Sequence, residues 1–245
     1  MYRYYIPHEL KIGDISHLAD NDSSVALKKG IKIEEIVEVE TYTSVFQCVV
    51  TDISGKSIEI EVLEKIEDRK IAKQGGSLTI VQSISSEKKF GLFLEKIVEI
   101  GVTKIIPIVS EYTLEDEKDF SKNTGLWKKI IKDATDQSRN PYPPTLEEIS
   151  TLSAIDNKIV ESRIRIALST EDVETKSLHQ ILANQDVKGS NIVVAIGPES
   201  GWSTKDLDVL KKMDFQFVRL EGNILRTETT ALVISSIIKF VRGEV

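Results

Sequence analysis

The stretch that decides the fold links an apolar run to a helix-like pattern and reads Ile196-Gly197-Pro198-Glu199-Ser200-Gly201-Trp202-Ser203. Residues 191–196 predict a buried strand, and residues 203–212 predict a helix with Ser203 as its N-cap and Asp206 completing a capping box. A second glycine-marked turn, at 220–230, precedes a helix that Thr227 is expected to cap. Ligands of open α/β sheets bind outside the carboxyl ends of the strands, so two such turns predict a shared pocket.

Strands and helices alternate around these turns. Strands are expected at 78–84, 104–109, 164–169, 191–196 and 216–220, and helices at 87–100, 124–138, 177–183, 203–212 and 227–241. Gly101 is the expected C-cap of the first helix. This alternation predicts a parallel sheet that is covered on both faces.

The first 70 residues have a different pattern. Strand-like runs occupy 31–39, 45–53 and 57–66, with a turn at Ser54-Gly55-Lys56 between the last two. Because no long helical pattern interrupts them, a small barrel or sandwich is expected. The charged segment 67–77 ends in two glycines and is interpreted as a linker between domains at 1–70 and 77–245.

Composition excludes several classes of protein. Of the 245 residues, 40% are hydrophobic and 29% charged, which is typical of a globular chain. The single cysteine, Cys48, can form neither an internal disulfide nor a metal cage, which favours the cytoplasm. His8, His17 and His179 lack metal-binding spacing, so no metal is expected. No signal peptide is expected, because residues 1–10 contain no apolar run, and no membrane span is expected, because the apolar run 231–238 is too short.

The net charge of −7 argues against a nucleic-acid partner unless basic residues gather locally. They do so at 118–142, which contains six basic residues and only three acidic ones. This stretch is either a solvated helix face or a phosphate-binding surface. The sequence has no phosphate-binding P-loop, no G-x-G-x-x-G and no G-x-S-x-G motif.

Four ordered motifs resemble those of one enzyme family. They are IGPESGWSTKDL at 196–207, NILRTETTALVISSI at 223–237, EKIVEIGVTKIIP at 95–107 and ATDQSRNPYPP at 134–144. Together they resemble the bacterial 16S rRNA (uracil-N3) methyltransferases, which are S-adenosylmethionine-dependent enzymes of the SPOUT class. The chain departs from the family pattern at Ser200, Glu221 and Asn223.

The resemblance implies a fold. It implies a C-terminal α/β SPOUT domain at 77–245, with a parallel sheet and a deep trefoil knot made by the loops 168–171, 196–201 and 220–230. It also implies a small PUA-like β-barrel at 1–70 that binds RNA. Deep knots are rare, which makes this expectation specific. Family members are homodimers in which the partner chain completes the substrate side of the site.

The resemblance also implies the site. S-adenosylmethionine would be held by Leu168, Ser169, Ile196, Gly197, Pro198, Glu199, Gly201, Leu220, Gly222, Ile224, Leu225, Thr227 and Thr230. Arg226 is the first candidate, and Arg139 the second, for the positive charge that lowers the pKa of uracil N3. Glu199 or Glu228 would accept a proton or hold an arginine. RNA would contact Arg3, Lys28, Lys29, Lys128, Lys132 and Arg139.

The function implied is methylation of N3 of a uridine in 16S rRNA, with free rRNA or the small ribosomal subunit as substrate. Two alternatives stay open. One is a knotted methyltransferase acting on another RNA. The other is an RNA-binding module without catalysis, which the departures at Ser200, Glu221 and Asn223 favour.

Overall fold

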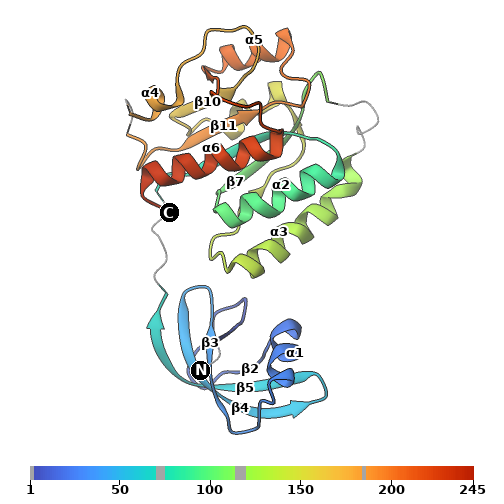
Figure 1. The fold of residues 1–245 in the computed structure, drawn as a ribbon, viewed down its shortest axis with the longest axis vertical. Helices are drawn as coiled ribbons and strands as arrows, with labels where there is room; N and C mark the ends of the chain where they lie inside the picture. Colours follow the sequence, from blue (N-terminus) through green and yellow to red (C-terminus); the bar gives the residue numbers. More distant parts are fainter. Residues whose placement is uncertain (1–2, 70–74, 114–119, 184–185) are drawn as a thin grey trace. The chain divides into compact units, whose positions relative to one another are not determined.

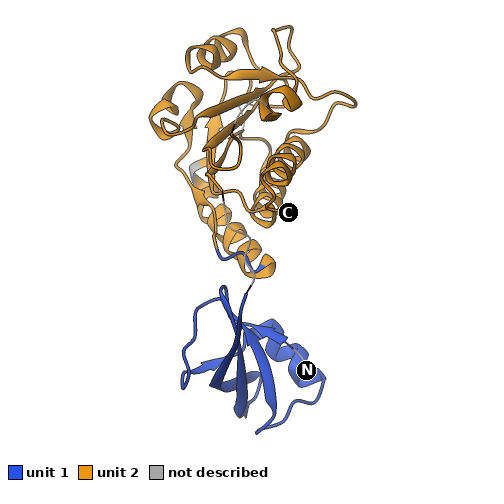
Figure 2. Ribbon diagram, turned by 90° about the vertical axis from the view of Figure 1, so that its left-hand side faces the viewer, with its two compact units in different colours: residues 1–71, 139–141 blue, residues 72–138, 142–245 orange. Residues whose placement is uncertain are grey.

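The first part of the chain contains two long strands in which buried and more exposed residues alternate. In the computed structural model, which describes residues 3–69, 75–113, 120–183 and 186–245, the chain divides into two units. One unit comprises residues 1–71 and 139–141, and the other 72–138 and 142–245 (Figure 2). Ile58, Ile60 and Val62 are buried in the first unit, while Glu59 and Glu61 between them are half-buried, as expected for strands with one face on a core.

The first unit has one mixed sheet and one helix (Figure 1). The elements are β1 (Arg3–Tyr5), β2 (Ile15–His17), α1 (Asp20–Lys28), β3 (Ile36–Glu40), β4 (Ser44–Ser54) and β5 (Ser57–Asp68). The sheet order is β1-β3-β4-β5-β2, with β1 parallel to β3 and the other pairs antiparallel. Among the described residues β1 and β2 form open edges, so the sheet does not close on itself.

Two expectations for this unit were wrong. The helix α1 was missed because its sequence is polar and buries only Ser23 and Ala26, which leaves no apolar period to detect. The strand expected from residue 31 begins only at Ile36. Glu34 has a φ of +67°, a left-handed conformation that interrupts an extended chain.

The second unit is a parallel sheet between layers of helices (Figure 1). Its strands are β6 (Leu78–Ser83), β7 (Lys104–Val109), β8 (Thr145–Leu146), β9 (Ser150–Thr151), β10 (Ile164–Leu168), β11 (Ile192–Ile196) and β12 (Gln216–Val218). Its helices are α2 (Glu87–Ile100), α3 (Thr124–Ser138), α4 (Leu178–Ala183), α5 (Thr204–Lys212) and α6 (Thr227–Arg242). All the expected strands and helices of this unit are confirmed to within two residues, and the two-residue strands β8 and β9 were missed.

Two apolar cores cover the two faces of this sheet, as the alternation predicted. One core contains side chains of α2, α3, α4 and α6, and the other contains side chains of α5 and of the turns at 152–159. The central strands β6, β10 and β11 are almost wholly buried, which explains their continuous apolar runs. In the described part of the chain, no helix is long and apolar enough to cross a membrane.

The helix termini follow local chemistry. Gly101 ends α2 in a left-handed conformation with φ +82°, as expected of a C-cap. Ser203 caps α5, and both hydrogen bonds of the predicted capping box with Asp206 are present. The expectation that Thr227 caps α6 was wrong. Arg226 is the N-cap residue, and Thr227 is already the first residue of the helix.

The strand order brings three turns together. It runs β12-β10-β11-β6-β7-β8, so β10 lies between β11 and β12 and pairs with both of them in parallel. The loops that follow these three strands therefore leave the same edge of the sheet side by side.

Candidate active site

One cavity of about 770 Å³ lies where the three loops meet. This volume falls within the range of small-molecule and cofactor sites. Loop 168–171 follows β10, loop 196–202 follows β11 and loop 218–227 follows β12; these are called the first, second and third loops below. Lys89 of α2 and Thr230 of α6 complete the lining.

Every residue that the resemblance placed at the cofactor lines this cavity. They are Leu168, Ser169, Ile196, Gly197, Pro198, Glu199, Gly201, Leu220, Gly222, Ile224, Leu225, Thr227 and Thr230. At Gly197 a Cβ atom would come within 3.0 Å of the Trp202 ring, so glycine permits the ring to pack there.

Of the four catalytic candidates, two line the cavity. Arg226 is exposed at its wall, and its carbonyl accepts hydrogen bonds from Thr230 N (2.8 Å) and Oγ1 (2.9 Å). Glu199 also lines it and is bound by the ammonium of Lys89. The expected arginine partner of Glu199 is thus a lysine in this structure.

The other two candidates lie elsewhere. Glu228 is buried in the first turn of α6, does not line the cavity, and accepts a hydrogen bond from Thr227 Oγ1 (3.3 Å). Arg139 belongs to the first unit. Its guanidinium binds the carboxylate of Glu40 and lies 5.3 Å from the centre of the Tyr5 ring.

Several cavity residues escaped the sequence analysis. Lys89, Val218 and Arg219 line the cavity although the sequence indicated no role for them, and Thr170 and Glu171, expected only as part of the loop 168–171, line it as well. Trp202, within a quoted motif, is buried, and its indole N–H donates to Leu168 O (2.8 Å). Lys89 lies about 110 positions from Glu199 in sequence, so no local pattern joins them.

The basic residues expected to contact RNA fall into two kinds. Lys28, Lys29, Lys128 and Lys132 are exposed, the first pair at the end of α1 and the second on α3. Arg3 is engaged with Glu38 (3.0 Å) and Glu67 (3.5 Å). Lys118, at the start of the basic stretch, lies outside the described residues.

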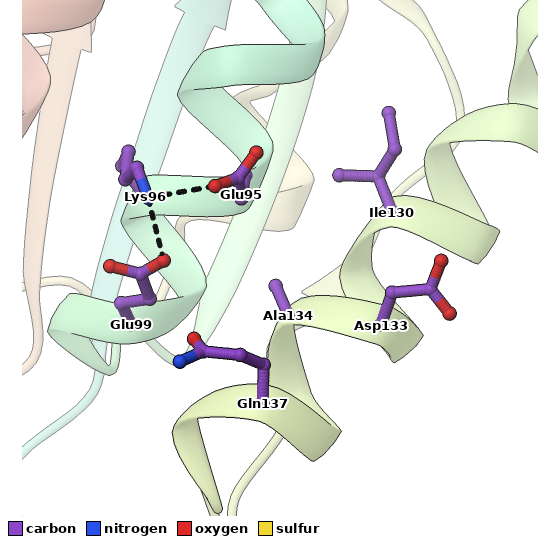
Figure 3. Close-up of a pocket in the computed structure, with 7 residues that line it drawn as sticks. All are labelled: Glu95, Lys96, Glu99, Ile130, Asp133, Ala134 and Gln137. Carbon is purple, nitrogen blue, oxygen red and sulfur yellow. Dashed lines mark hydrogen bonds and ion pairs between the residues drawn. The ribbon is translucent and has the colours of Figure 1, made fainter. Parts of the chain in front are cut away.

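A second hollow, of about 580 Å³, lies between α2 and α3 (Figure 3). Here the quoted motifs at 95–107 and 134–144 meet, through Lys96 and Glu99 on one helix and Ala134 and Gln137 on the other. Lys96 binds Glu95 (2.7 Å) and Glu99 (2.9 Å), which raise its pKa to about 12. Its charge is thus satisfied within α2.

No group of three or more potential metal ligands occurs among the residues that the structure describes.

Comparisons with known proteins point to RNA methyltransferases. A family model described as an RNA methyltransferase domain matches residues 72–239. A ribosomal RNA small subunit methyltransferase E of Aquifex aeolicus is 32% identical over 79% of this chain and 80% of its own length. A protein of the same name from Buchnera aphidicola, of the Acyrthosiphon pisum subspecies, is 27% identical over 99% of this chain and 94% of its own length.

A solved structure extends the likeness over both units. The crystal structure of a ribosomal RNA small subunit methyltransferase E from Neisseria gonorrhoeae, bound to S-adenosyl methionine, matches with a TM-score of 0.74. Its identity to this chain is 26%, and the match covers 98% of each chain.

Proposed function

Because this chain belongs to the RNA methyltransferase family, we propose that it methylates N3 of a uridine in 16S ribosomal RNA, with S-adenosylmethionine as methyl donor. The observation that carries the proposal is the convergence of three βα loops on one cavity. The volume of this cavity is large enough for a cofactor. A relative of the same fold, 26% identical to this chain, has been solved with this donor bound.

The chemistry explains why an arginine belongs at the cavity. When bound, S-adenosylmethionine supplies a methyl group on a positively charged sulfur. Uracil N3 carries a proton and attacks poorly until that proton leaves. Arg226, at the wall of the cavity, stabilises the deprotonated base by its positive charge. The three loops hold the base and the methyl group in line.

Glu199 is our choice as the proton acceptor. It lines the cavity and Glu228 does not. Lys89 holds its carboxylate at the wall. In the proposed step the N3–H proton passes to Glu199, N3 forms the bond to the methyl carbon, and the carbon–sulfur bond breaks with its electron pair left on sulfur.

We further propose that the second unit is a SPOUT domain whose three cavity loops form a deep trefoil knot. Two contacts support this proposal. The third loop touches the first through Arg219, and the chain then continues into α6, which packs against α2 and β11. An experimental structure in which residues 227–245 lie outside every earlier loop would refute the knot.

For the first unit, we propose a PUA-like RNA-binding domain at 1–70. Residues 1–70 carry nine basic and fourteen acidic side chains, a net −5, so phosphates can approach only where lysines gather. Lys28 and Lys29 are exposed at the end of α1, and on the second unit Lys128 and Lys132 are exposed on α3. We also propose that the enzyme is a cytoplasmic homodimer, with rRNA or the small subunit as its substrate.

The function is tested by mapping methylated uridines in 16S rRNA from cells with and without the gene. We expect one N3-methyluridine to disappear. An unchanged pattern would move the assignment to another RNA. Calorimetry with S-adenosylmethionine separates an enzyme from a bare RNA-binding module, since the module would show no binding.

Arg226 has its own test. We expect Arg226→Ala to lower turnover about 100-fold or more, because a charge beside the reacting base is lost. The dissociation constant for S-adenosylmethionine, measured by calorimetry, should change little. Arg226→Lys keeps the charge and should retain more activity. Wild-type turnover in Arg226→Ala would remove this residue from the mechanism.

A further inference from the structure

The first cavity loop lies between the other two, because β10 pairs with both β11 and β12. Glu171, at the end of this loop, bonds to both loop backbones on its side of the cavity. Its Oε1 accepts the backbone N–H of Trp202 in the second loop (2.9 Å). Its Oε2 accepts the Ser169 hydroxyl (2.5 Å) and the Thr170 N–H (3.1 Å) of its own loop.

Arg219 joins the third loop to the same segment. One guanidinium nitrogen donates to Thr170 O (2.9 Å) and to Glu171 O (2.6 Å). Arg219 and Glu171 both line the cavity. The three loops are therefore connected through residues 170–171, by the Glu171 carboxylate on one side and by backbone carbonyls on the other.

The second loop has a shape that fits this carboxylate. Gly201 has a φ of +79°, and a Cβ atom there would lie 1.9 Å from Glu171 Oε1. A glycine at this position thus leaves the space that the carboxylate fills. The indole N–H of Trp202 adds a second link, to Leu168 O (2.8 Å).

We propose that Glu171 is a positioning residue for the methyl-donor site, with Arg219 as its counterpart on the third loop. Glu171 acts through the loops, holding their backbones in the arrangement that binds the donor before the donor arrives. Preorganised loops avoid the entropy cost of becoming ordered when the donor binds. Loss of the hydrogen bonds made by Glu171 or Arg219 therefore weakens the affinity for the donor. The inference rests on the proposed function.

The test is Glu171→Gln. Glutamine has the size of glutamate but carries one oxygen and one NH₂ group. In either orientation of the amide, the NH₂ faces a backbone N–H donor, either that of Trp202 or that of Thr170. We expect S-adenosylmethionine affinity, measured by calorimetry on the full-length protein, to fall roughly 10- to 100-fold, as for loss of hydrogen bonds to a charged group. Amide exchange at Trp202 should become faster.

Two further variants make the result decisive. Glu174→Gln changes an exposed residue three positions beyond the first loop that does not line the cavity, and should bind the donor as the wild type does. Arg219→Ala removes the hydrogen bonds that connect the third loop to the first, and it should also weaken the affinity for S-adenosylmethionine.

The outcomes separate the two proposals. Normal donor affinity in folded Glu171→Gln and Arg219→Ala would overturn the inference and leave the function intact. A wild-type protein that does not bind the donor would overturn both. If Glu171→Gln fails to fold, Arg219→Ala decides alone.

Discussion

At the residue scale, the cavity depends on side chains whose chemical type is fixed by what they touch. Lys89 is the cation that binds Glu199. The ring of Trp202 packs against Gly197, where a larger residue would leave it too little room. Replacement of such a residue changes geometry as well as charge, because the neighbouring loops have no regular secondary structure to hold them.

Gly201→Ala should destabilise the protein and weaken donor binding. Alanine is strained at φ +79°, at a cost of about 1 kcal/mol, and its Cβ would collide with Glu171, at about 1–3 kcal/mol more. Denaturant unfolding measures the loss of stability, and calorimetry measures the loss of affinity for the donor. Gly30→Ala is the matched control, because Gly30 has a φ of +76° but nothing within 4 Å of its Cβ position. Equal losses of stability in the two variants would contradict the collision.

Cys48 predicts a pH dependence. Burial raises the pKa of this thiol from 9.0 to about 12. The unfolded chain therefore loses the thiol proton at lower pH than the folded protein does. Its stabilising contribution is complete below pH 9, declines as the pH rises above 9, and is gone by about pH 12. Unfolding free energies of wild type and Cys48→Ala, measured between pH 8 and pH 10, should converge as the pH rises. A constant difference would contradict the assignment.

At the element scale, helix α6 is fixed at both of its ends. Its first turn contributes Thr227 and Thr230 to the cavity. Its last turn contains Arg242, a buried cation that donates to four backbone carbonyls, those of Val187 (3.1 Å), Gly76 (2.6 Å), Ser77 (3.3 Å) and Ser190 (2.6 Å). This arginine ties the end of the chain to the segment that enters β6 and to the loop before β11.

Arg242→Ala should lower the free energy of unfolding by about 3 kcal/mol or more. The variant removes the arginine donor from the buried carbonyls of Val187 and Ser190, and each buried group left without a donor costs about 1–3 kcal/mol. Urea denaturation measures the change. Lys212→Ala, an exposed cation in the last turn of α5, is the control and should change stability by less than about 0.5 kcal/mol. A loss in Arg242→Ala no larger than in this control would show that the carbonyls find other partners.

At the scale of the whole molecule, the exposed apolar end of α6 gives the proposed dimer a testable surface. Phe240 is 72% exposed and Val245 78% exposed. Phe240 lies in the last turn of α6, and large exposed apolar side chains occur at interaction surfaces, so Phe240 is the residue to test.

The wild type should have twice the 27.5 kDa mass of one chain in light scattering. Phe240→Glu should shift it towards the monomer and lower turnover, because the partner is proposed to complete the substrate side. Val160→Glu, at a similarly exposed position in the same unit (67% exposed), should leave the mass unchanged. A monomeric wild type would refute the dimer.

The sequence by itself determined the α-helices and all but the two-residue strands of the second unit, together with the two glycine-marked turns. These features are local. In α2, apolar side chains recur at the helical period because one face must be buried, and in β11 they are continuous because both faces are covered. In the first unit, α1 lacks such a period and was missed for that reason.

The tertiary structure alone decided which residues meet. That β10 inserts between β11 and β12, that Glu171 and Arg219 join three loops, that Lys89 holds Glu199, and that Arg139 lies with Glu40 are all matters of strand order and long-range packing. Contacts between residues tens of positions apart follow from how the layers assemble. The periodicity of a single segment records only which of its faces is buried, and it carries no information about the partner.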